Sequence, residues 1–444
     1  MTLMTLPSTA NTPAINDSQS TPGNPQPTVP GLQSSISNRQ STIDNLQSSP
    51  RPILVTCGLG SAPWLAGELR ALGYEIMAER DSGVELVGTL RDAMQLNLLV
   101  RTGNRVMLEL GRQNAVTADN LYRFVTELAW ENVLPDDGYF TVASFVNTPA
   151  INDSRFVNVR CKDAIVDRFR GLTGRRPNSG NERSGAVVFV YWNGSDLRLY
   201  LDTSGESLSR RGYRKIPLAA PMQETLAAAV VLATGWTGDT PFVNPMCGSG
   251  TLAIEAALIA TGRPPGLLRS EFAFQHLRGF DDAVWRELRA EAQRRPIRKP
   301  PYPIVASDLS REAVEATRRS ALTAGVEHLI EYHVCDFAAT PLPATPGIVI
   351  LNPEYGERLG EDEPESPLYR RIGDFFKQQC QGWQGFVFTG NLAWGKQIGL
   401  RTSSKQLFFN SKIECRLLGF KIYAGSVRSK YATGKDAKAD VAST

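Results

Sequence analysis

From Pro221 to about Tyr423 the chain alternates short apolar segments with helical ones, and this pattern limits the possible fold more than any other feature. The apolar segments are 241–243, 304–307, 329–335, 347–351 and 385–388, with a late pair near 406–410 and 417–423. Short apolar strands separated by helices predict a parallel sheet that is covered on both faces. A segment rich in Pro and Arg, from Thr261 to Pro303, interrupts the alternation and is predicted to be an insertion.

The chain before Pro221 predicts a different architecture. Between Ile53 and Leu110 the pattern gives strand, helix, strand, strand, helix and strand, with Ser61 as the N-cap of the first helix. This order is ferredoxin-like. A second segment of mixed helices and strands follows, from Thr117 to Asp202.

The two ends of the chain and its overall charge narrow the class of protein. Residues 1–50 are dense in Ser, Thr, Pro, Asn and Gln, and the chain beyond about Gly425 is small, polar and charged, so both are predicted to be disordered. The net charge of +3 excludes a polycation, so any contact with nucleic acid must come from local basic patches. No apolar run approaches the roughly 18 residues of a membrane span.

The six cysteines and three histidines give no metal-binding pattern. No two cysteines form a C-x-x-C pair, and the histidines His276, His328 and His333 lack metal-ligand spacing. We therefore predict no metal site, and reduced thiols in a soluble intracellular protein of the cytoplasm.

The sharpest local motif is N-P-M-C-G-S-G-T-L-A-I-E at Asn244–Glu255, which follows an apolar strand and opens a helix. Gly248 and Gly250 let the backbone approach a ligand closely, and the helix N-terminus presents free N–H groups. The motif also matches the dinucleotide pattern G-x-G-x-x-A, but that match alone is weak, since the acid about twenty residues on is Glu271, outside any strand. The acid that does end a strand is Asp308.

Two other readings of this loop are excluded by the residues present. No G-x-x-x-x-G-K-[ST] motif occurs, so the loop does not belong to a P-loop NTPase. Cys247 stands where the pattern G-x-S-x-G needs glycine, so Ser249 is not the serine of a nucleophile elbow. Cys247 itself has no histidine partner in the motif, and a small packing residue is the better interpretation.

The second motif is L-N-P-E-Y-G-E-R-L-G at Leu351–Gly360, directly after an apolar strand. The sequence Asn-Pro-x-Tyr at a strand end places a carboxamide, exposed carbonyls and an aromatic ring at the carboxyl edge of the sheet. Such oxygens accept hydrogen bonds from an exocyclic amine, and the ring can stack on a flat base. A glycine loop, a strand-end acid and this turn, in that order, are far more specific together than alone.

With these motifs the chain resembles the class I S-adenosylmethionine-dependent methyltransferases that modify amino nitrogens. More narrowly, the segments 162–170, 201–214 and 221–229 resemble the THUMP-containing guanine-N2 RNA methyltransferases, and the likeness covers nearly everything from Arg51 to Tyr423. The resemblance implies an α/β fold, in which a doubly wound, Rossmann-like methyltransferase domain with a mostly parallel sheet follows an α+β ferredoxin-like plus THUMP module. The expected domains are a tail at 1–50, a ferredoxin-like subdomain at 51–112, a THUMP domain at 113–216, a methyltransferase domain at 217–424 with its insertion at about 261–303, and a tail at 425–444.

The resemblance also implies roles for individual residues at the sheet edge. Asp308 is expected to hold the ribose hydroxyls of S-adenosylmethionine. The other residues expected to bind or support the cofactor are Glu224, Thr225, Asn244, Pro245, Met246, Cys247, Gly248, Ser249, Gly250, Thr251, Leu309, Asp336 and Phe337. The catalytic turn is expected to comprise Asn352, Pro353, Glu354 and Tyr355.

Basic residues cluster at 160–176, at 210–215 and at 286–299, and each cluster alone is typical of a solvated surface. Together with the resemblance they predict a surface that follows RNA phosphates. The residues expected to bind structured RNA, with 23S rRNA favoured and tRNA as the alternative, are Arg160, Lys162, Arg170, Arg210, Arg211, Arg214 and Lys215. Tyr213 either stacks on a base or is a buried aromatic of the linker.

Two departures from the family pattern leave alternatives open. Asn244 stands where an acid is commoner, and Glu354 stands where the turn usually has a second proline. Glu354 is an exposed turn residue, or a carboxylate that faces the N–H groups of guanine, or a sign of impaired activity. The rival functions are methylation of another amine, in tRNA guanine, DNA adenine or a glutamine side chain, and RNA binding without catalysis.

Overall fold

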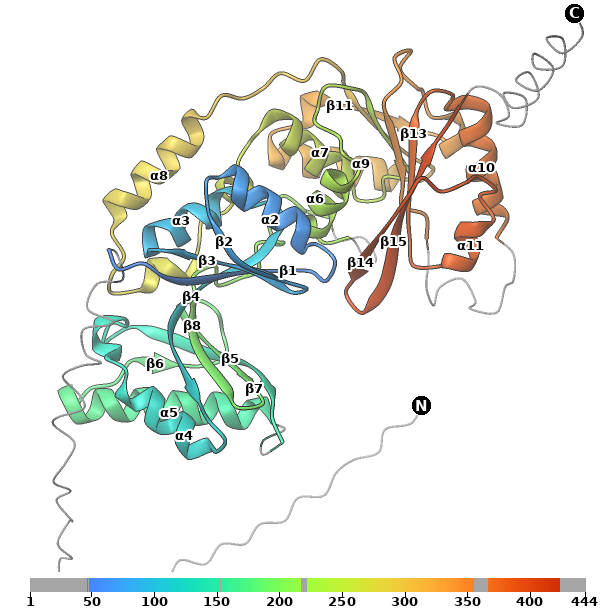
Figure 1. Ribbon diagram of the computed structural model, residues 1–444. Helices are drawn as coiled ribbons and strands as arrows, with labels where there is room; N and C mark the ends of the chain where they lie inside the picture. Colours follow the sequence, from blue (N-terminus) through green and yellow to red (C-terminus); the bar gives the residue numbers. More distant parts are fainter. Residues whose placement is uncertain are drawn as a thin grey trace, which may run out of the picture. The chain divides into compact units, whose positions relative to one another are not determined.

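The computed structural model describes residues 46, 48–149, 151, 153–216, 222–354 and 366–423, and within these ranges the strands form two sheets. The first sheet has eight strands in the order β2-β3-β1-β4-β8-β7-β5-β6, and the second has seven in the order β11-β10-β9-β12-β13-β15-β14 (Figure 1). Nearly all residues of the two predicted tails lie outside the described residues. Tyr355 also lies outside them.

The first half of the eight-stranded sheet has the ferredoxin-like order that the sequence predicted. Its elements are β1 (Arg51–Cys57), α2 (Ala62–Ala71), β2 (Ile76–Arg80), β3 (Gly83–Gly88), α3 (Leu90–Leu99) and β4 (Gly103–Asn114). β1 lies between β3 and β4 and is antiparallel to both. Thr89 caps α3, with Asp92 completing a capping box, whereas the side chain of Ser61, the predicted cap of α2, makes no capping hydrogen bond.

The second half of this sheet belongs to the segment predicted to be a THUMP domain. Its elements are α4 (Ala118–Glu127), β5 (Tyr139–Asn147), α5 (Ser154–Thr173), β6 (Asn178–Ser179), β7 (Ala186–Asn193) and β8 (Asp196–Asp202). β5 pairs in parallel with β7, which forms an antiparallel hairpin with β8. The long strand β4 pairs with β1 near its start and with β8 through the rest of its length, so it joins both modules in one sheet.

The seven-stranded sheet is that of the predicted methyltransferase domain. Its strands are β9 (Phe242–Pro245), β10 (Ile304–Asp308), β11 (Ile330–Val334), β12 (Ile348–Leu351), β13 (Gln384–Thr389), β14 (Ser404–Asn410) and β15 (Ile413–Lys421). β9 to β13 are parallel, and β15 is antiparallel to β13 and β14. The strand order reverses between β9 and β12, which is where open α/β sheets bind ligands, at the carboxyl ends of the strands.

Both faces of this sheet are buried, as the continuous apolar strands predicted. The helices are α6 (Glu224–Ala233), α7 (Thr251–Thr261), α9 (Arg311–Ala324), α10 (Pro367–Gln379) and α11 (Leu392–Lys396). Phe242 and Ile350 join a core cluster with residues of α6 and α7, whereas their neighbours Val243 and Val349 join a second cluster with residues of α10. Successive residues of a strand thus pack into cores on opposite faces of the sheet, as in a doubly wound domain.

The insertion between β9 and β10 packs against the ferredoxin-like module. It contains two short 3-10 helices, η3 (Pro265–Leu268) and η4 (Ala273–His276), and α8 (Asp282–Arg294). Phe274 and Trp285 are buried in the same core cluster as residues of α3, and Arg91 pairs with Glu287 at 3.1 Å. A segment that interrupted the sequence pattern therefore links the two halves of the protein. Among the described residues, no helix is both long and apolar enough to cross a membrane.

Candidate active site

The predicted site residues converge at the carboxyl edge of the seven-stranded sheet. The glycine loop Asn244–Thr251 follows β9, Asp308 ends β10, Asp336 and Phe337 follow β11, and Asn352 follows β12. These four strands are neighbours in the order β11-β10-β9-β12. Segments separated by more than a hundred residues in sequence are thus brought to one edge, across the reversal of strand order.

Three residues of the glycine loop have a left-handed backbone conformation, which glycine adopts most readily. Met246, Gly248 and Gly250 have φ angles of 60°, 55° and 76°, in the left-handed region. A Cβ on Gly250 would overlap the side chain of Thr317, whereas a Cβ on Gly248 would meet no atom within 4 Å. Gly250 is therefore required for packing, and the open space at Gly248 leaves the backbone accessible to a ligand.

Asp308 is tied to this loop by its carboxylate. Oδ2 accepts a hydrogen bond from the Gly248 N–H at 2.9 Å, and Oδ1 accepts one from the Ser310 N–H at 2.9 Å. Thr317 holds the loop from the other side, because its hydroxyl donates to the Gly248 carbonyl at 2.9 Å. Each carboxylate oxygen keeps a further lone pair, so Asp308 can also accept hydrogen bonds from ligand hydroxyls.

Two amide side chains at this edge have an unused acceptor. The side-chain nitrogen of Asn244 donates to the Ile350 carbonyl at 3.0 Å, but its Oδ1 is buried without a hydrogen-bond partner among the described residues. Asn352 Oδ1 is likewise buried without a hydrogen-bond partner among the described residues. Leaving a buried acceptor unsatisfied costs about 1–3 kcal/mol, so two such atoms beside one loop indicate a site that awaits hydrogen-bond donors.

Asp336 and Phe337 lie at the end of the neighbouring strand β11, and both contact Arg371 of α10. The Arg371 Nη2 donates to both carboxylate oxygens of Asp336 at 2.8 and 2.9 Å, and its guanidinium lies 4.9 Å from the centre of the Phe337 ring. Phe337 is buried edge-on against Phe375. The carboxylate of Asp336, a residue expected to bind the cofactor, is therefore engaged by an arginine.

Glu224 and Thr225, at the start of α6, are both buried but face different partners. Glu224 lies 3.6 Å from the Arg214 guanidinium, which also donates to the Thr251 hydroxyl at 3.1 Å. Thr225 donates instead to the side chain of Asn104 at 2.6 Å, in the ferredoxin-like module. Glu224 thus supports the glycine loop through Arg214, whereas direct support by Thr225 is not seen.

The remaining residues predicted to bind cofactor belong to the loop or its surroundings. Pro245 is buried at the end of β9, and the Ser249 and Thr251 hydroxyls lie 3.2 Å apart. Burial raises the pKa of the Cys247 thiol to about 12, which fits a packing residue and opposes a nucleophile. The Leu309 side chain is 75% exposed beside Asp308, so it is free to cover a ligand.

Five of the seven residues predicted to bind RNA lie at the surface. Arg160, Lys162 and Arg170 are on α5, where each pairs with an aspartate, at 2.8, 2.9 and 3.6 Å. Arg210 is 75% exposed and pairs with Glu206 at 2.8 Å, and Lys215 is exposed. Exposed pairs of this kind contribute about 0–1 kcal/mol, so they can be exchanged for contacts with phosphates.

The prediction that Arg211 forms part of this surface is wrong, whereas Arg214 is partly buried, with 21% of its side chain exposed. Arg211 is 2% exposed, and its Nε and Nη2 donate to Glu255 at 2.8 and 3.1 Å. The Tyr213 hydroxyl also donates to Glu255, at 3.1 Å, so Tyr213 is a buried aromatic of the linker. Arg214 reaches the glycine loop. Arg211 and Tyr213 hold the linker on α7 through the buried carboxylate of Glu255.

Sequence reasoning missed Thr317, Arg371 and Glu255. Thr317 and Arg371 lie on surface-type helices with no local motif, so nothing in the sequence marks them. Glu255 did carry a signal, because it is an acid inside the apolar helix T-L-A-I-E-A-A-L. Charged residues are almost never fully buried without a partner, so that position predicted a buried basic group. Among the described residues, no group of His, Cys, Asp or Glu could hold a metal ion.

The strand order and the site at its reversal define a class I methyltransferase. Family models match the three parts of the chain: the RlmL ferredoxin-like domain at residues 52–107, the THUMP domain at 115–202, and the RMKL-like methyltransferase domain at 211–418. The crystal structure of "SMU.472, a putative methyltransferase complexed with SAH" has a TM-score of 0.76 and 28% identity, covering 86% of this chain and 100% of that one.

Curated relatives agree with these domains. The "Ribosomal RNA large subunit methyltransferase K/L" of Syntrophotalea carbinolica is 38% identical over 384 residues, which cover 84% of this chain and 54% of that protein. The chain therefore spans about half the length of that relative. The "Putative RNA methyltransferase slr0064" of Synechocystis is 34% identical, covering 84% of this chain and 97% of that protein. The chain belongs to the family of THUMP-containing RNA methyltransferases with an RMKL-like catalytic domain, and the fold class and family predicted from the sequence are confirmed.

Proposed function

We propose that the protein transfers a methyl group from S-adenosylmethionine to the exocyclic N2 of a guanine in structured RNA, with 23S rRNA as the substrate. The observation that carries this proposal is the unpartnered Asn352 Oδ1 at the end of β12, across the strand reversal from the glycine loop. An acceptor in that place suits a substrate amine that must be aligned with a methyl donor. We place the reaction in the cytoplasm, in keeping with an rRNA substrate.

The residues at the sheet edge fit S-adenosylmethionine. Asp308 has lone pairs for the ribose hydroxyls, Gly248 leaves the loop backbone open, and the Asn244 Oδ1 is an orphan acceptor for an ammonium group. The cofactor, once bound there, supplies an electrophilic methyl group. A relative of similar fold was crystallised with SAH, the product left after methyl transfer, and this supports the assignment.

The catalytic turn acts by positioning. The exocyclic amine of guanine is a poor nucleophile, because its lone pair is delocalised into the ring. Hydrogen bonds from N2–H to the Asn352 Oδ1 and the Pro353 carbonyl would hold the nitrogen in line with the methyl group and keep water away. Tyr355, which lies outside the described residues, is proposed to stack on the base. No side chain has to act as a strong base in this scheme.

The experiment that tests the proposal uses the purified chain, isotopically labelled S-adenosylmethionine, and 23S rRNA and tRNA from cells that lack the protein. We expect label in N2-methylguanosine of 23S rRNA after digestion and mass spectrometry. Label in tRNA guanine, or in adenine of added DNA, would show a different amine substrate. No transfer to any of them would favour the rival reading of an RNA-binding protein without catalysis.

Replacing Asp308 with alanine should weaken the binding of S-adenosylmethionine by about tenfold or more. Hydrogen bonds to a charged group contribute about 1.5–3 kcal/mol, and the variant also loses the tether to Gly248. Titration calorimetry measures the effect, and Glu312→Ala is the control, because Glu312 is an exposed acid on the adjoining helix α9. An affinity equal to that of the control would show that Asp308 does not hold the ribose.

Replacing Glu354 with proline should leave the methylation rate within about threefold of the wild-type rate. Glu354 is exposed in the structure, which supports its interpretation as a turn residue, and the substitution restores the usual turn of the family. If its carboxylate instead accepts hydrogen bonds from guanine, the loss should be about tenfold or more, as for other charge-assisted contacts. Single-turnover kinetics with 23S rRNA distinguishes the two results.

A further inference from the structure

A cavity lies where the THUMP segment, the linker and the insertion meet. It has a volume of about 270 Å³ and is lined by Arg183 before β7, by Arg210 and Arg211 of the linker, and by Arg269 of the insertion. Pockets for drug-sized ligands span about 300–1,000 Å³, so this cavity suits a small group. None of its lining residues belongs to the candidate active site.

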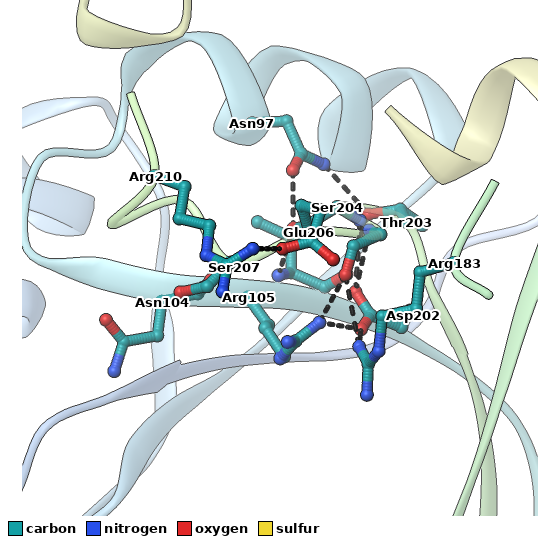
Figure 2. A network of polar contacts seen from close by, with 12 residues as sticks. Asn97, Asn104, Arg105, Arg183, Asp202, Thr203, Ser204, Glu206, Ser207 and Arg210 are labelled. Atoms are coloured by element: carbon teal, nitrogen blue, oxygen red, sulfur yellow. Dashed lines mark hydrogen bonds and ion pairs between the residues drawn. The ribbon is translucent and has the colours of Figure 1, made fainter. Parts of the chain in front are cut away.

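One buried carboxylate is shared by two arginines beside this cavity. Arg105 and Arg183 both donate from Nη1 to Asp202 Oδ2, the latter at 3.2 Å, and both also donate to the Gly205 carbonyl (Figure 2). The Asp202 side chain is fully buried at the end of β8. Two guanidinium charges therefore meet one carboxylate charge, which leaves a net positive charge at this point.

Arg269 adds a guanidinium that has only neutral partners. It donates to the carbonyls of Ser204, Glu206, Ser207 and Glu271, at 2.7 to 3.3 Å. Burial lowers its pKa to about 10, so it is still charged at neutral pH. The group thus carries its charge in a desolvated place, where its hydrogen bonds go to carbonyls and the carboxylates of Glu206 and Asp202 act on it from a distance.

The other charged groups of the cavity do not remove this excess. Arg210 pairs with Glu206 (Figure 2). Arg211 is neutralised by Glu255. Glu206 and Glu271 are both exposed, so water and salt screen their carboxylates. Among these wall residues, Arg183 is 27% exposed and so lies deeper than Glu206, which is 48% exposed.

We propose that this cavity binds a phosphate group of the RNA substrate through the guanidinium of Arg183, with the charge of Arg269 beside it. Guanidinium groups are the side chains best matched to phosphate oxygens, and a bound phosphate would compensate the charge that Asp202 leaves unpaired. The contact carries no sequence information. It fixes the register of a folded RNA against the catalytic domain, because the cavity is built from the THUMP segment, the linker and the insertion. This inference rests on the proposed function, since it requires an RNA substrate.

The test compares full-length Arg183→Gln with the wild type in filter binding to deproteinised 23S rRNA over a range of salt. We expect about tenfold weaker binding at 0.1 M salt, and a salt slope smaller by about 0.7–0.9, the contribution of one phosphate. Arg183→Lys should retain part of the affinity, and S-adenosylmethionine binding should not change. The matched control is Arg319→Gln, which removes an exposed arginine of α9.

Equal affinity and equal slope for Arg183→Gln and Arg319→Gln would overturn the phosphate site. Failure of the wild type to bind any RNA would overturn the proposed function instead, so the two failures are distinguishable. Repeating the binding with phosphatase-treated RNA distinguishes two sources of the phosphate. If the site binds a terminal phosphate, the treatment should abolish the difference in affinity between the variant and the wild type. If it binds an internal phosphodiester, the difference should persist.

Because Arg183 also binds Asp202, its replacement can disturb folding, and a second measurement uses the wild type alone. Phenylglyoxal modifies accessible arginines, and mass spectrometry follows each site. RNA should slow the modification of Arg183 and leave that of Arg319 unchanged. Equal modification of Arg183 with and without bound RNA would contradict the proposal.

Discussion

Replacing Asn352 with alanine should lower the rate of methyl transfer by on the order of a hundredfold or more, with little change in the binding of RNA or cofactor. The Asn352 Oδ1 is a buried acceptor without a partner among the described residues, so the free protein loses nothing when it is removed. The contact that is lost forms only when the substrate amine enters. A loss of turnover with unchanged binding identifies an interaction made in the transition state.

Single-turnover kinetics, calorimetry and RNA filter binding on one preparation would measure these three quantities. Asn352→Asp is the matched variant, since it keeps an acceptor oxygen at the same place and should retain more activity than the alanine variant. If both variants lose all methyl transfer and also bind the cofactor more weakly, Asn352 shapes the glycine loop and does not contact the substrate.

Replacing Arg211 with alanine should lower the free energy of unfolding by about 3–5 kcal/mol, because it leaves the Glu255 carboxylate buried and unpaired. Glu255 is 0% exposed, and among the described residues its carboxylate accepts hydrogen bonds from Arg211 and, at 3.1 Å, from the Tyr213 hydroxyl. The Arg211 Nη2 also donates to the Arg101 carbonyl at 2.6 Å, so the variant loosens the junction with the ferredoxin-like module. The salt slope of RNA binding should not change.

Thermal unfolding of the full chain measures the loss, and the neighbouring Arg210→Ala is the control. Arg210 is in an exposed pair with Glu206, so its removal should cost about 0–1 kcal/mol. The double variant Arg211→Met with Glu255→Leu should recover much of the stability, since apolar packing can replace a buried pair. A melting temperature for Arg211→Ala equal to that of Arg210→Ala would mean that the pair does not stabilise the junction.

The sequence predicted the sheet and its edge well, because these depend on local patterns. Apolar runs gave every strand of the methyltransferase sheet, and residues that follow parallel strands must share one edge. Asp308, Asn352 and the glycine loop could therefore be placed together before any coordinates were known. The left-handed φ angles of Gly248 and Gly250 are what the motif predicts.

The sequence could not predict the contacts between distant segments. Arg210, Arg211 and Arg214 form one basic run, yet only the first is at the surface, because the linker turns its other two arginines toward α7 and the glycine loop. Composition cannot reveal which side of an irregular linker faces a neighbouring domain. The domain boundary predicted at residue 112 likewise falls inside β4, since a strand can continue from one module into the next.

The insertion shows a third limit. Its Pro- and Arg-rich sequence predicted only an interruption of the pattern, but Phe274 and Trp285 are buried in the core of the amino-terminal half. The burial of these aromatic residues depends on a partner surface that lies almost two hundred residues earlier in the sequence. The hydrogen bonds of Arg269 go to backbone carbonyls, which no sequence pattern encodes.

The most direct test of the account is mass spectrometry of the nucleosides in 23S rRNA and tRNA from cells that lack the protein. We predict the loss of N2-methylguanosine from one site in 23S rRNA, no change in tRNA, and recovery with the wild-type chain but not with Asn352→Ala. An unchanged 23S rRNA, with a methylated base missing from tRNA or with no base missing at all, would contradict the proposed function.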